Sequence, residues 1–182
     1  MGTAPDYGRV AKVYDFLVNI YSMGQTRVSK ASQIRKIQPG DRVLIAGAGA
    51  GTDVVEAARR GAKVTVVELA APMVDVIRER LDKSGLLDRA ELIVGDILQH
   101  KVSGHQRYDI VTANFLLPVF DKDRWPDVLR HLTQLIKPGG KLLIADFAPI
   151  RGPSAMRMLQ AAYYAIGNFS VGLTAGNTLH RR

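Results

Sequence analysis

Three glycines at alternate positions, Gly47, Gly49 and Gly51, have the clearest chemical use in this chain, and they directly follow the apolar run of residues 43–46. Glycine has no side chain and adopts positive φ readily, so its backbone can lie close against a bound molecule. The helix-like stretch of residues 52–60 comes next, and the free N–H groups of its first turn would face the same molecule. We therefore predict a buried strand, a turn that approaches a ligand, and a helix.

Four polar residues stand where further strands are expected to end: Glu68, Asp96, Asn114 and Asp146. A carboxylate at Glu68 can accept hydrogen bonds from both ribose hydroxyls of a nucleoside. Asp96 can accept a hydrogen bond from an exocyclic amine, and Ile97 can pack on a base. Each residue alone is explained as well by a helix cap or a loop. Together, behind a glycine turn, they predict a nucleoside site.

The elements that must position these residues alternate between strand and helix. The predicted strands cover residues 42–46, 63–68, 90–94, 108–113 and 141–146, and the predicted helices between them cover residues 51–60, 72–84 and 124–136. Repeated βα units of this kind specify a parallel sheet with helices on both faces. In such a sheet the ligand lies beyond the carboxyl ends of the strands, at the topological switch point.

The glycine spacing separates this turn from a dinucleotide-binding fingerprint. The NAD pattern needs G-x-G-x-x-G/A, and Thr52 and Val54 stand at its third position in the frames that start at Gly47 and Gly49. The observed G-x-G-x-G spacing resembles the first motif of class I S-adenosylmethionine-dependent methyltransferases, whose glycine turn passes beneath the methionine part of the cofactor. A tight βα turn without a ligand is the alternative interpretation.

The order of motifs over residues 41–147 extends this resemblance. After the glycine turn come Glu68, Gly95-Asp96-Ile97, Tyr108-Asp109-Ile110-Val111 and the stretch of residues 135–142. The resemblance implies an α/β fold with a doubly wound, mostly parallel Rossmann-like sheet in the strand order 3-2-1-4-5, and S-adenosylmethionine as cofactor. The cofactor-binding residues that it implies are Gly47, Ala48, Gly49 and Gly51 at the methionine end, Glu68 at the ribose with Leu69 after it, Asp96 and Ile97 at the adenine, and Asn114 on the cofactor side.

Shorter stretches resemble the ubiquinone/menaquinone C-methyltransferase family. They are Tyr14-Asp15-Phe16-Leu17 with Ser22-Met23-Gly24, and Asp121-Lys122-Asp123. The resemblance implies an enzyme that transfers a methyl group to a lipophilic quinone or related aromatic ring. Because a phenolic ring needs deprotonation, we take Tyr14 and Asp15 as candidate catalytic residues. The predicted substrate contacts are Tyr7, Tyr21, Leu117 and Tyr163.

Two departures from the family pattern lie inside the predicted core. Class I methyltransferases usually carry an acidic residue two positions before the first motif glycine, where this chain has Ile45. The quinone family has polar residues, including an arginine, after the fourth strand, where residues 115–120 here are Phe-Leu-Leu-Pro-Val-Phe. Two alternatives therefore stay open: a methyltransferase for another small-molecule or nucleic-acid acceptor, and a cofactor-binding relative that transfers no methyl group.

The third departure concerns the carboxyl-terminal part. The family normally adds an antiparallel strand pair after the fifth strand, and residues 172–182, rich in Gly, Thr and Asn, do not provide it. We expect either a shortened chain or a sheet with an exposed edge, which would favour a homodimer. The predicted organisation is one domain with an N-terminal helical lid (1–40), a cofactor-binding core (41–150) and an apolar helix with a tail (151–182).

Charge and composition indicate the surroundings of the protein. The chain has 182 residues, a net charge of +8 and no cysteine, and its four histidines lack metal-ligand spacing, so we predict no metal site. Residues 41–150 hold fifteen basic and fifteen acidic residues, so the positive excess lies in the two flanks. This pattern favours peripheral contact with an anionic membrane by a cytoplasmic protein, while the apolar segment after the fourth strand disfavours nucleic acid.

Overall fold

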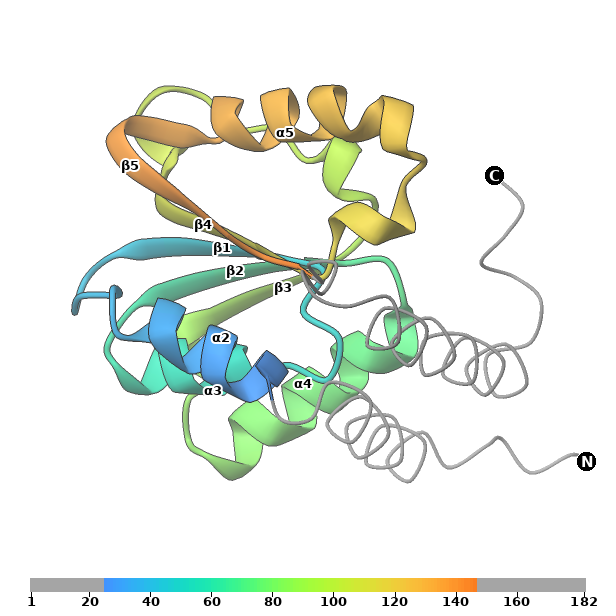
Figure 1. Ribbon diagram of the computed structural model, residues 1–182. Coiled ribbons are helices and arrows are strands. Elements are labelled where there is room, and N and C mark those ends of the chain that lie inside the picture. Colours follow the sequence, from blue (N-terminus) through green and yellow to red (C-terminus); the bar gives the residue numbers. More distant parts are fainter. Residues whose placement is uncertain (1–24, 147–182) are drawn as a thin grey trace, which may run out of the picture.

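Five parallel strands form one sheet in the order β3-β2-β1-β4-β5, and their arrowheads point to the same edge (Figure 1). This computed structural model describes residues 25–146. The strands are β1 (Arg42–Ala46), β2 (Lys63–Glu68), β3 (Ala90–Val94), β4 (Tyr108–Asn114) and β5 (Ile136–Ala145). The helices are α2 (Gln25–Ile34), α3 (Thr52–Arg59), α4 (Ala71–Lys83) and α5 (Trp125–Gln134). The short 3-10 turns are η1 (Leu87–Arg89), η2 (Ile97–Gln99), η3 (Gly104–Gln106), η4 (Leu117–Val119) and η5 (Lys122–Arg124). The predicted fold class and strand order are confirmed.

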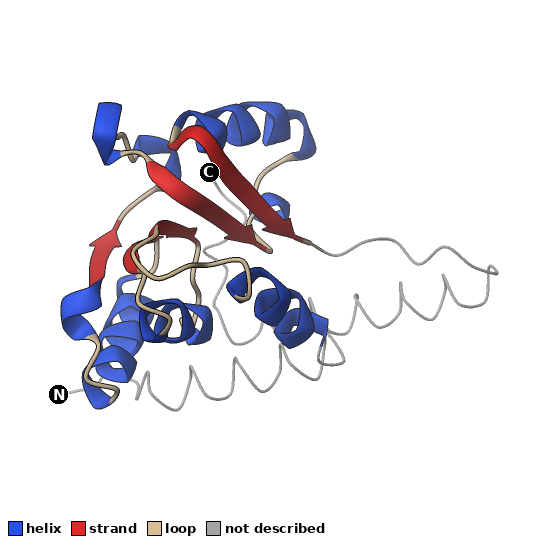
Figure 2. Cartoon of the chain, turned by 90° about the vertical axis from the view of Figure 1, so that its left-hand side faces the viewer, coloured by secondary structure: helices blue, strands red, loops and turns tan. Residues whose placement is uncertain are grey.

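Helices cover both faces of the sheet. Helix α5 lies on one face and helices α2, α3 and α4 lie on the other (Figure 1), and the view turned by 90° shows the same layering (Figure 2). The core beneath α2, α3 and α4 includes Ile34, Ile37, Val43, Ile45, Val54, Val64, Val66, Ile77, Leu81 and Ile110. The core beneath α5 includes Leu44, Val67, Ile97, Tyr108, Val111, Val128, Leu132 and Leu135. Because the central strands are covered on both faces, residues 43–46 and 64–67 are all buried, Thr65 among them.

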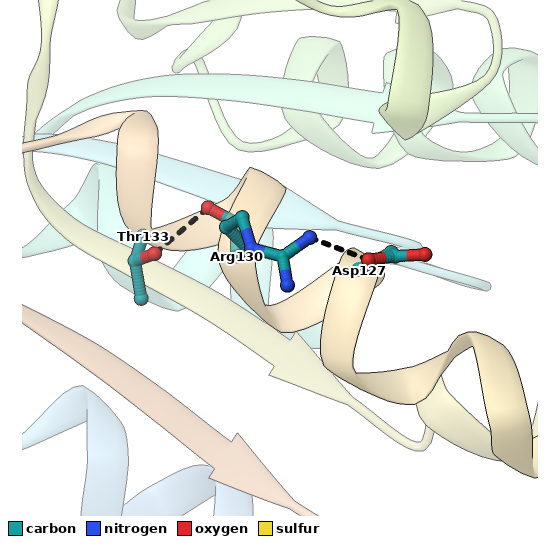
Figure 3. A network of polar contacts seen from close by, with 3 residues as sticks. All are labelled: Asp127, Arg130 and Thr133. Atoms are coloured by element: carbon teal, nitrogen blue, oxygen red, sulfur yellow. Dashed lines mark hydrogen bonds and ion pairs between the residues drawn. The ribbon is translucent and has the colours of Figure 1, made fainter.

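The outer side of α5 carries polar contacts within the helix (Figure 3). Arg130 Nη1 donates to Asp127 Oδ1, and Thr133 Oγ1 donates to the carbonyl oxygen of Arg130 at 2.8 Å. On the other side of the helix Val128 and Leu132 are fully buried. Exposed pairs of this kind contribute little stability, so burial of the apolar side holds α5 on the sheet. We assign the network a structural role.

The last strand starts earlier than the sequence predicts. The prediction is a strand over residues 141–146, whereas β5 begins at Ile136, which pairs with Tyr108. The ladder is irregular after this first pair and is regular again from Lys141 onward. Pro138 lies inside the irregular part, where its missing N–H removes no regular ladder bond. Local turn signals mark the irregularity but do not reveal a pairing with a distant strand.

The amino edge of the sheet holds a polar group away from the predicted ligand site. His100 Nε2 lies 2.9 Å from the hydroxyl of Tyr108, and the guanidinium of Arg42 lies 5.8 Å from the centre of the Tyr108 ring. Burial lowers the pKa of His100, with Glu91 opposing and His131 adding to the shift. Burial also raises the pKa of Tyr108. Both groups lie away from the glycine turn, so we assign these pKa shifts to packing at the amino edge of the sheet.

Helix α2 packs into the core through Ile34, which is buried with Ile37 in the turn that follows. Several predictions fall outside the described residues: the first helix of the lid, the apolar carboxyl-terminal helix, and the question of a final strand pair. The proposed limits of the three regions and the homodimer therefore stay predictions. Within residues 25–146, no helix is long and apolar enough to cross a membrane.

Candidate functional site

The glycine turn joins β1 to α3 at the carboxyl edge of the sheet. Gly47, Gly49 and Gly51 have φ angles of 69°, 55° and 72°, in the left-handed region that favours glycine. The N–H of Gly47 donates to the carbonyl oxygen of Val67 at 2.9 Å, which ties the start of the turn to β2. The predicted backbone conformation of the turn is therefore present.

Gly51 has a reason of its own to be glycine. It is the N-cap of α3, and a Cβ atom placed on it would lie 2.4 Å from Cγ1 of Ile77 in α4. A separation this short is a clash, so Gly51 allows α3 and α4 to approach each other. The glycine spacing predicts a ligand contact at Gly51 but not this packing constraint, because the contact joins two separate helices.

Gly49 lies at the open part of the turn. A Cβ atom on Gly49 would meet no described atom within 4 Å beyond its chain neighbours. Its N–H donates to Oε2 of Glu68 at 3.0 Å, and Oε1 of Glu68 accepts from the N–H of Ala70 at 3.0 Å. One carboxylate thus holds the glycine turn beside the carboxyl end of β2, and the space that a side chain at Gly49 would enter is open.

Asp96 and Ile97 follow β3 at the same edge. Oδ1 of Asp96 accepts from the N–H of Leu98 at 2.9 Å and caps the turn η2, while His131 of α5 donates to the carbonyl oxygen of Ile97 at 2.8 Å. The side chain of Ile97 is only 5% exposed, whereas Leu69, directly after Glu68, is 67% exposed. Leu69 therefore offers an adenine ring far more apolar surface than Ile97.

The carboxyl end of β4 combines a buried amide with a strained backbone. Asn114 is 9% exposed, and its Oδ1 has no hydrogen-bond partner among residues 25–146. Phe115 has a φ of 57°, the one positive value at a non-glycine residue in the described part of the chain. Its N–H donates to the carbonyl oxygen of Ala145 at 2.8 Å, which fixes the end of β4 against β5. Strained backbone of this kind is often found at functional sites. The composition of the sequence did not predict the positive φ of Phe115.

The segment after β4 borders the glycine turn. A Cβ atom on Gly47 would lie 3.1 Å from Cδ1 of Leu116, so the segment and the turn are in close contact. Leu117, a predicted substrate contact, is 7% exposed and belongs to the core beneath α5. Its side chain therefore presents little surface to a substrate in this structure.

Exposed large apolar side chains gather at the carboxyl edge of the sheet. Among the described residues the exposed ones are Leu69, Leu87, Val94, Val119 and Ile144. Leu69, Val94 and Ile144 lie at or directly after the carboxyl end of a strand, as the glycine turn and Glu68 do, and Val119 lies in the turn η4 that follows β4. Apolar surface beside polar anchors is typical of small-molecule sites.

The fold brings together five predicted cofactor-binding residues at the carboxyl ends of β1, β2 and β4: Gly47, Gly49, Glu68, Leu69 and Asn114. Tyr7, Tyr14, Asp15, Tyr21 and Tyr163, the other predicted catalytic and substrate residues, lie outside the described residues. Within residues 25–146, no cluster of His, Asp and Glu could hold a metal ion. The described residues therefore form the side of the site that would hold the cofactor.

The described residues fit S-adenosylmethionine. The open space at Gly49 admits a ligand, the second lone pairs of Glu68 can accept from ribose hydroxyls, and Leu69 can cover a base. The unpartnered Oδ1 of Asn114 can accept from a cationic group such as the amino group of the methionine. Fold and site together define a Rossmann-like domain of the class I methyltransferase type.

Comparison with known proteins agrees with this class. A family model described as a methyltransferase domain matches residues 43–140, which is more than half of the 182 residues. The chain belongs to this methyltransferase domain family.

Individual relatives extend the comparison. The chain is similar to the ubiquinone/menaquinone biosynthesis C-methyltransferase UbiE of Cereibacter sphaeroides, with 28% identity over 161 residues that cover 86% of this chain and 62% of the relative. It is also similar to the CcbJ methyltransferase from Streptomyces caelestis, with a TM-score of 0.56, 27% identity, and coverage of 64% of this chain and 47% of that one. The chain thus spans about 62% of the length of the curated relative.

A third comparison concerns the fold alone. The S-adenosylmethionine-dependent methyltransferase from Thiobacillus denitrificans, solved in complex with S-adenosylhomocysteine, has a TM-score of 0.60 at 18% identity. The match covers 80% of this chain and 61% of that one. At this identity the likeness supports the Rossmann-like architecture of the chain.

Proposed function

We propose that this protein is an S-adenosylmethionine-dependent methyltransferase that acts on a lipophilic quinone or a related aromatic ring. The observation that carries the cofactor part is the carboxylate of Glu68, which accepts from the N–H groups of Gly49 and Ala70, where the space beside Gly49 is open. Membership of the methyltransferase domain family supports the same conclusion.

In this proposal the described residues bind the cofactor and orient it. When bound, S-adenosylmethionine supplies an electrophilic methyl group on its sulfonium. Glu68 holds the glycine turn and the ribose, Leu69 covers the base, and the chain at Phe115 is fixed by its bond to β5. Holding the two reacting groups in line and excluding water lowers the barrier by roughly 7 to 11 kcal/mol in favourable cases.

The acceptor part of the proposal rests on apolar surface and on similarity. Val119 and Ile144 are 59% and 40% exposed near the carboxyl ends of β4 and β5, where an acceptor would approach the cofactor. The likeness to UbiE of Cereibacter sphaeroides favours a quinone ring. A carbon or oxygen nucleophile on such a ring must lose a proton, and Tyr14 and Asp15 stay the candidates for that step.

A second candidate function is cofactor binding without methyl transfer. It is favoured by Ile45, which is 2% exposed in the core at the position where the family usually carries an acidic residue. A lost electrostatic partner would weaken binding of the cofactor rather than abolish the site. The two functions differ in whether a methyl group leaves the cofactor.

Transfer of a labelled methyl group separates the two candidates. The full chain is incubated with S-adenosylmethionine labelled in its methyl group and with a demethylated quinol, a catechol or an oligonucleotide in parallel. We expect label in the quinol or catechol, reduced in Glu68→Gln and unchanged in Asp88→Asn, an exposed carboxylate outside the site. Binding of S-adenosylhomocysteine without label in any acceptor would favour the second candidate.

We also infer peripheral contact with an anionic membrane, because the proposed acceptor is lipophilic and the chain carries a net charge of +8. The positive excess lies in the flanks, residues 1–40 and 151–182, because residues 41–150 hold fifteen basic and fifteen acidic residues. Flotation with anionic vesicles tests this contact, which should be lost at high salt. Equal flotation with neutral vesicles would contradict it.

A further inference from the structure

A pocket of about 430 Å³ lies at the amino edge of the sheet, opposite the edge that carries the glycine turn. Residues from the first part of β1, β2, β3 and β4 and from the turn η1 line it. In Figure 1 the arrowheads of these strands point away from this edge. Pockets of this volume hold small organic molecules, and the proposed function does not use this pocket.

The polar side chains of the pocket share one face of the sheet. Arg42 pairs with Lys63 across β1 and β2, and Thr65 pairs with Glu91 across β2 and β3. Paired residues of parallel strands lie on the same face, and so do residues two apart in one strand, such as Lys63 and Thr65. Tyr108, the first residue of β4, joins them, since Cζ of Arg42 lies 5.8 Å from the centre of its ring. Four strands thus present polar side chains to one pocket.

Basic side chains outnumber carboxylates in the lining of the pocket: Arg42, Lys63 and Arg89 stand against Asp88 and Glu91. Lys63 forms no ion pair with any residue of the described part of the chain. Arg89 Nε lies 3.9 Å from Oδ2 of Asp88, and the two side chains are 49% and 79% exposed, so this pair is weak. The remaining positive charge favours an anionic ligand.

Arg42 is the basic side chain that the fold holds in place. Its Nη2 donates to the carbonyl oxygen of Gln106 at 3.0 Å, and its backbone N–H donates to Oδ2 of Asp109 at 3.0 Å. Its Nε is buried and has no hydrogen-bond partner among residues 25–146. A guanidinium that is fixed and still has an unused donor is suited to receive an anion, and its planar fork matches the oxygens of a phosphate.

We propose that this pocket binds the phosphate group of a small phosphomonoester, with Arg42 and Lys63 as its principal contacts. A phosphomonoester carries nearly two negative charges at neutral pH, because its second pKa is about 6, so it gains more from this pocket than a carboxylate does. Glu91 opposes the anion. The pocket and the glycine turn lie at opposite edges of the sheet, so the inference goes beyond the proposed function and does not depend on it.

Calorimetric titration of the full folded chain with glycerol 3-phosphate tests the proposal, and glycerol is the uncharged control. We expect saturable binding of glycerol 3-phosphate, the same affinity when S-adenosylhomocysteine is present in excess, and no binding of glycerol. A folded chain that does not bind glycerol 3-phosphate overturns the inference. Competition between glycerol 3-phosphate and S-adenosylhomocysteine overturns it too, because the phosphate would then bind at the cofactor edge.

Substitutions of opposite sign locate the phosphate. Lys63→Met removes an attracting charge and should weaken glycerol 3-phosphate about two- to fivefold, whereas Glu91→Gln removes a repelling charge and should strengthen it by a similar factor. Lys63 and Glu91 are exposed, so both variants should fold. Lys83→Met is the matched control, because Lys83 is 70% exposed on α4 outside the pocket, and it should leave the affinity unchanged. Equal effects at Lys63 and Lys83, or weaker binding in Glu91→Gln, overturn the inference.

The contact with Arg42 has its own variant. Arg42→Lys keeps the positive charge but loses the planar fork, so we expect glycerol 3-phosphate to bind about tenfold more weakly. Unchanged affinity in a folded Arg42→Lys chain contradicts the role of Arg42, and should this variant not fold, the pair of substitutions at Lys63 and Glu91 decides.

Flotation with vesicles that contain phosphatidic acid distinguishes two sources of the phosphomonoester. Retention that Lys63→Met lowers and Lys83→Met does not assigns the phosphate to a lipid head group. Equal retention of the two variants, together with weaker glycerol 3-phosphate binding in Lys63→Met, assigns it to a soluble molecule.

Discussion

At the scale of single residues, the glycines of the turn meet different constraints, and substitution should separate them. Gly51→Ala adds a methyl group 2.4 Å from Ile77 and keeps a positive φ, so we expect a loss of about 2 to 5 kcal/mol in the free energy of unfolding. Gly49→Ala meets no described atom within 4 Å and should lose only about 1 to 2 kcal/mol. Urea unfolding measures both, and equal losses would contradict the packing role of Gly51.

Glu68 links the turn to the ligand, so its substitution should affect both stability and affinity. An amide at this position retains one acceptor oxygen and directs its NH₂ group at a backbone N–H, because Glu68 accepts from both Gly49 and Ala70. We expect Glu68→Gln to lose about 1 kcal/mol of stability and to bind S-adenosylhomocysteine at least about tenfold more weakly. Asp88→Asn removes an exposed carboxylate at the amino edge of the sheet and is the control for loss of charge alone. Unchanged affinity in Glu68→Gln would contradict the proposed contact.

At the scale of elements, an ion pair adds to the apolar packing that attaches α2 to the core. Lys30 Nζ of α2 lies 3.0 Å from Oδ2 of Asp53, whose side chain is 4% exposed in the first turn of α3. A buried charge that loses its partner destabilises strongly, so Asp53→Asn and Lys30→Met should each cost about 2 to 4 kcal/mol, and the double substitution less than their sum. The exposed pair of Arg59 and Glu56 should show a coupling energy below about 1 kcal/mol in the same unfolding cycle. Additive effects at Lys30 and Asp53 would mean that the pair does not hold α2.

The elements also show what the sequence could predict. Local periodicity and glycine spacing predicted all five strands, the helices between them and the place of Glu68, because those signals lie within one short stretch of chain. The start of β5 at Ile136, the contact of Gly51 with Ile77 and the positive φ of Phe115 were not predicted. Each of these depends on residues far apart in the sequence, which pattern reading in one sequence does not connect.

At the scale of the whole molecule, stability should fall in acid through the amino edge of the sheet. Partial burial opposes the shift, but bonds from Lys137 and from the N–H of Arg42 lower the pKa of Asp109. A carboxyl whose pKa is lower in the folded state stabilises that state above its unfolded pKa of about 3.9, and the contribution is lost as the pH falls through the folded value. Asp109→Asn should be less stable at neutral pH and should lose less stability on acidification below about pH 4. Parallel pH profiles for the two proteins would contradict this account.

The central claim is that the carboxyl edge of this sheet, at the turn of Gly47 to Gly51 and at Glu68, binds S-adenosylmethionine. The most direct measurement is a calorimetric titration of the full folded chain with S-adenosylhomocysteine, repeated with Gly49→Ala, whose added methyl group would enter the open space in which we propose the cofactor binds. The account predicts saturable binding of one nucleoside per chain, and binding at least about tenfold weaker in the variant, as expected when a good contact is lost. A folded wild-type chain that releases no heat of binding, or a variant that binds as tightly as the wild type, would contradict it.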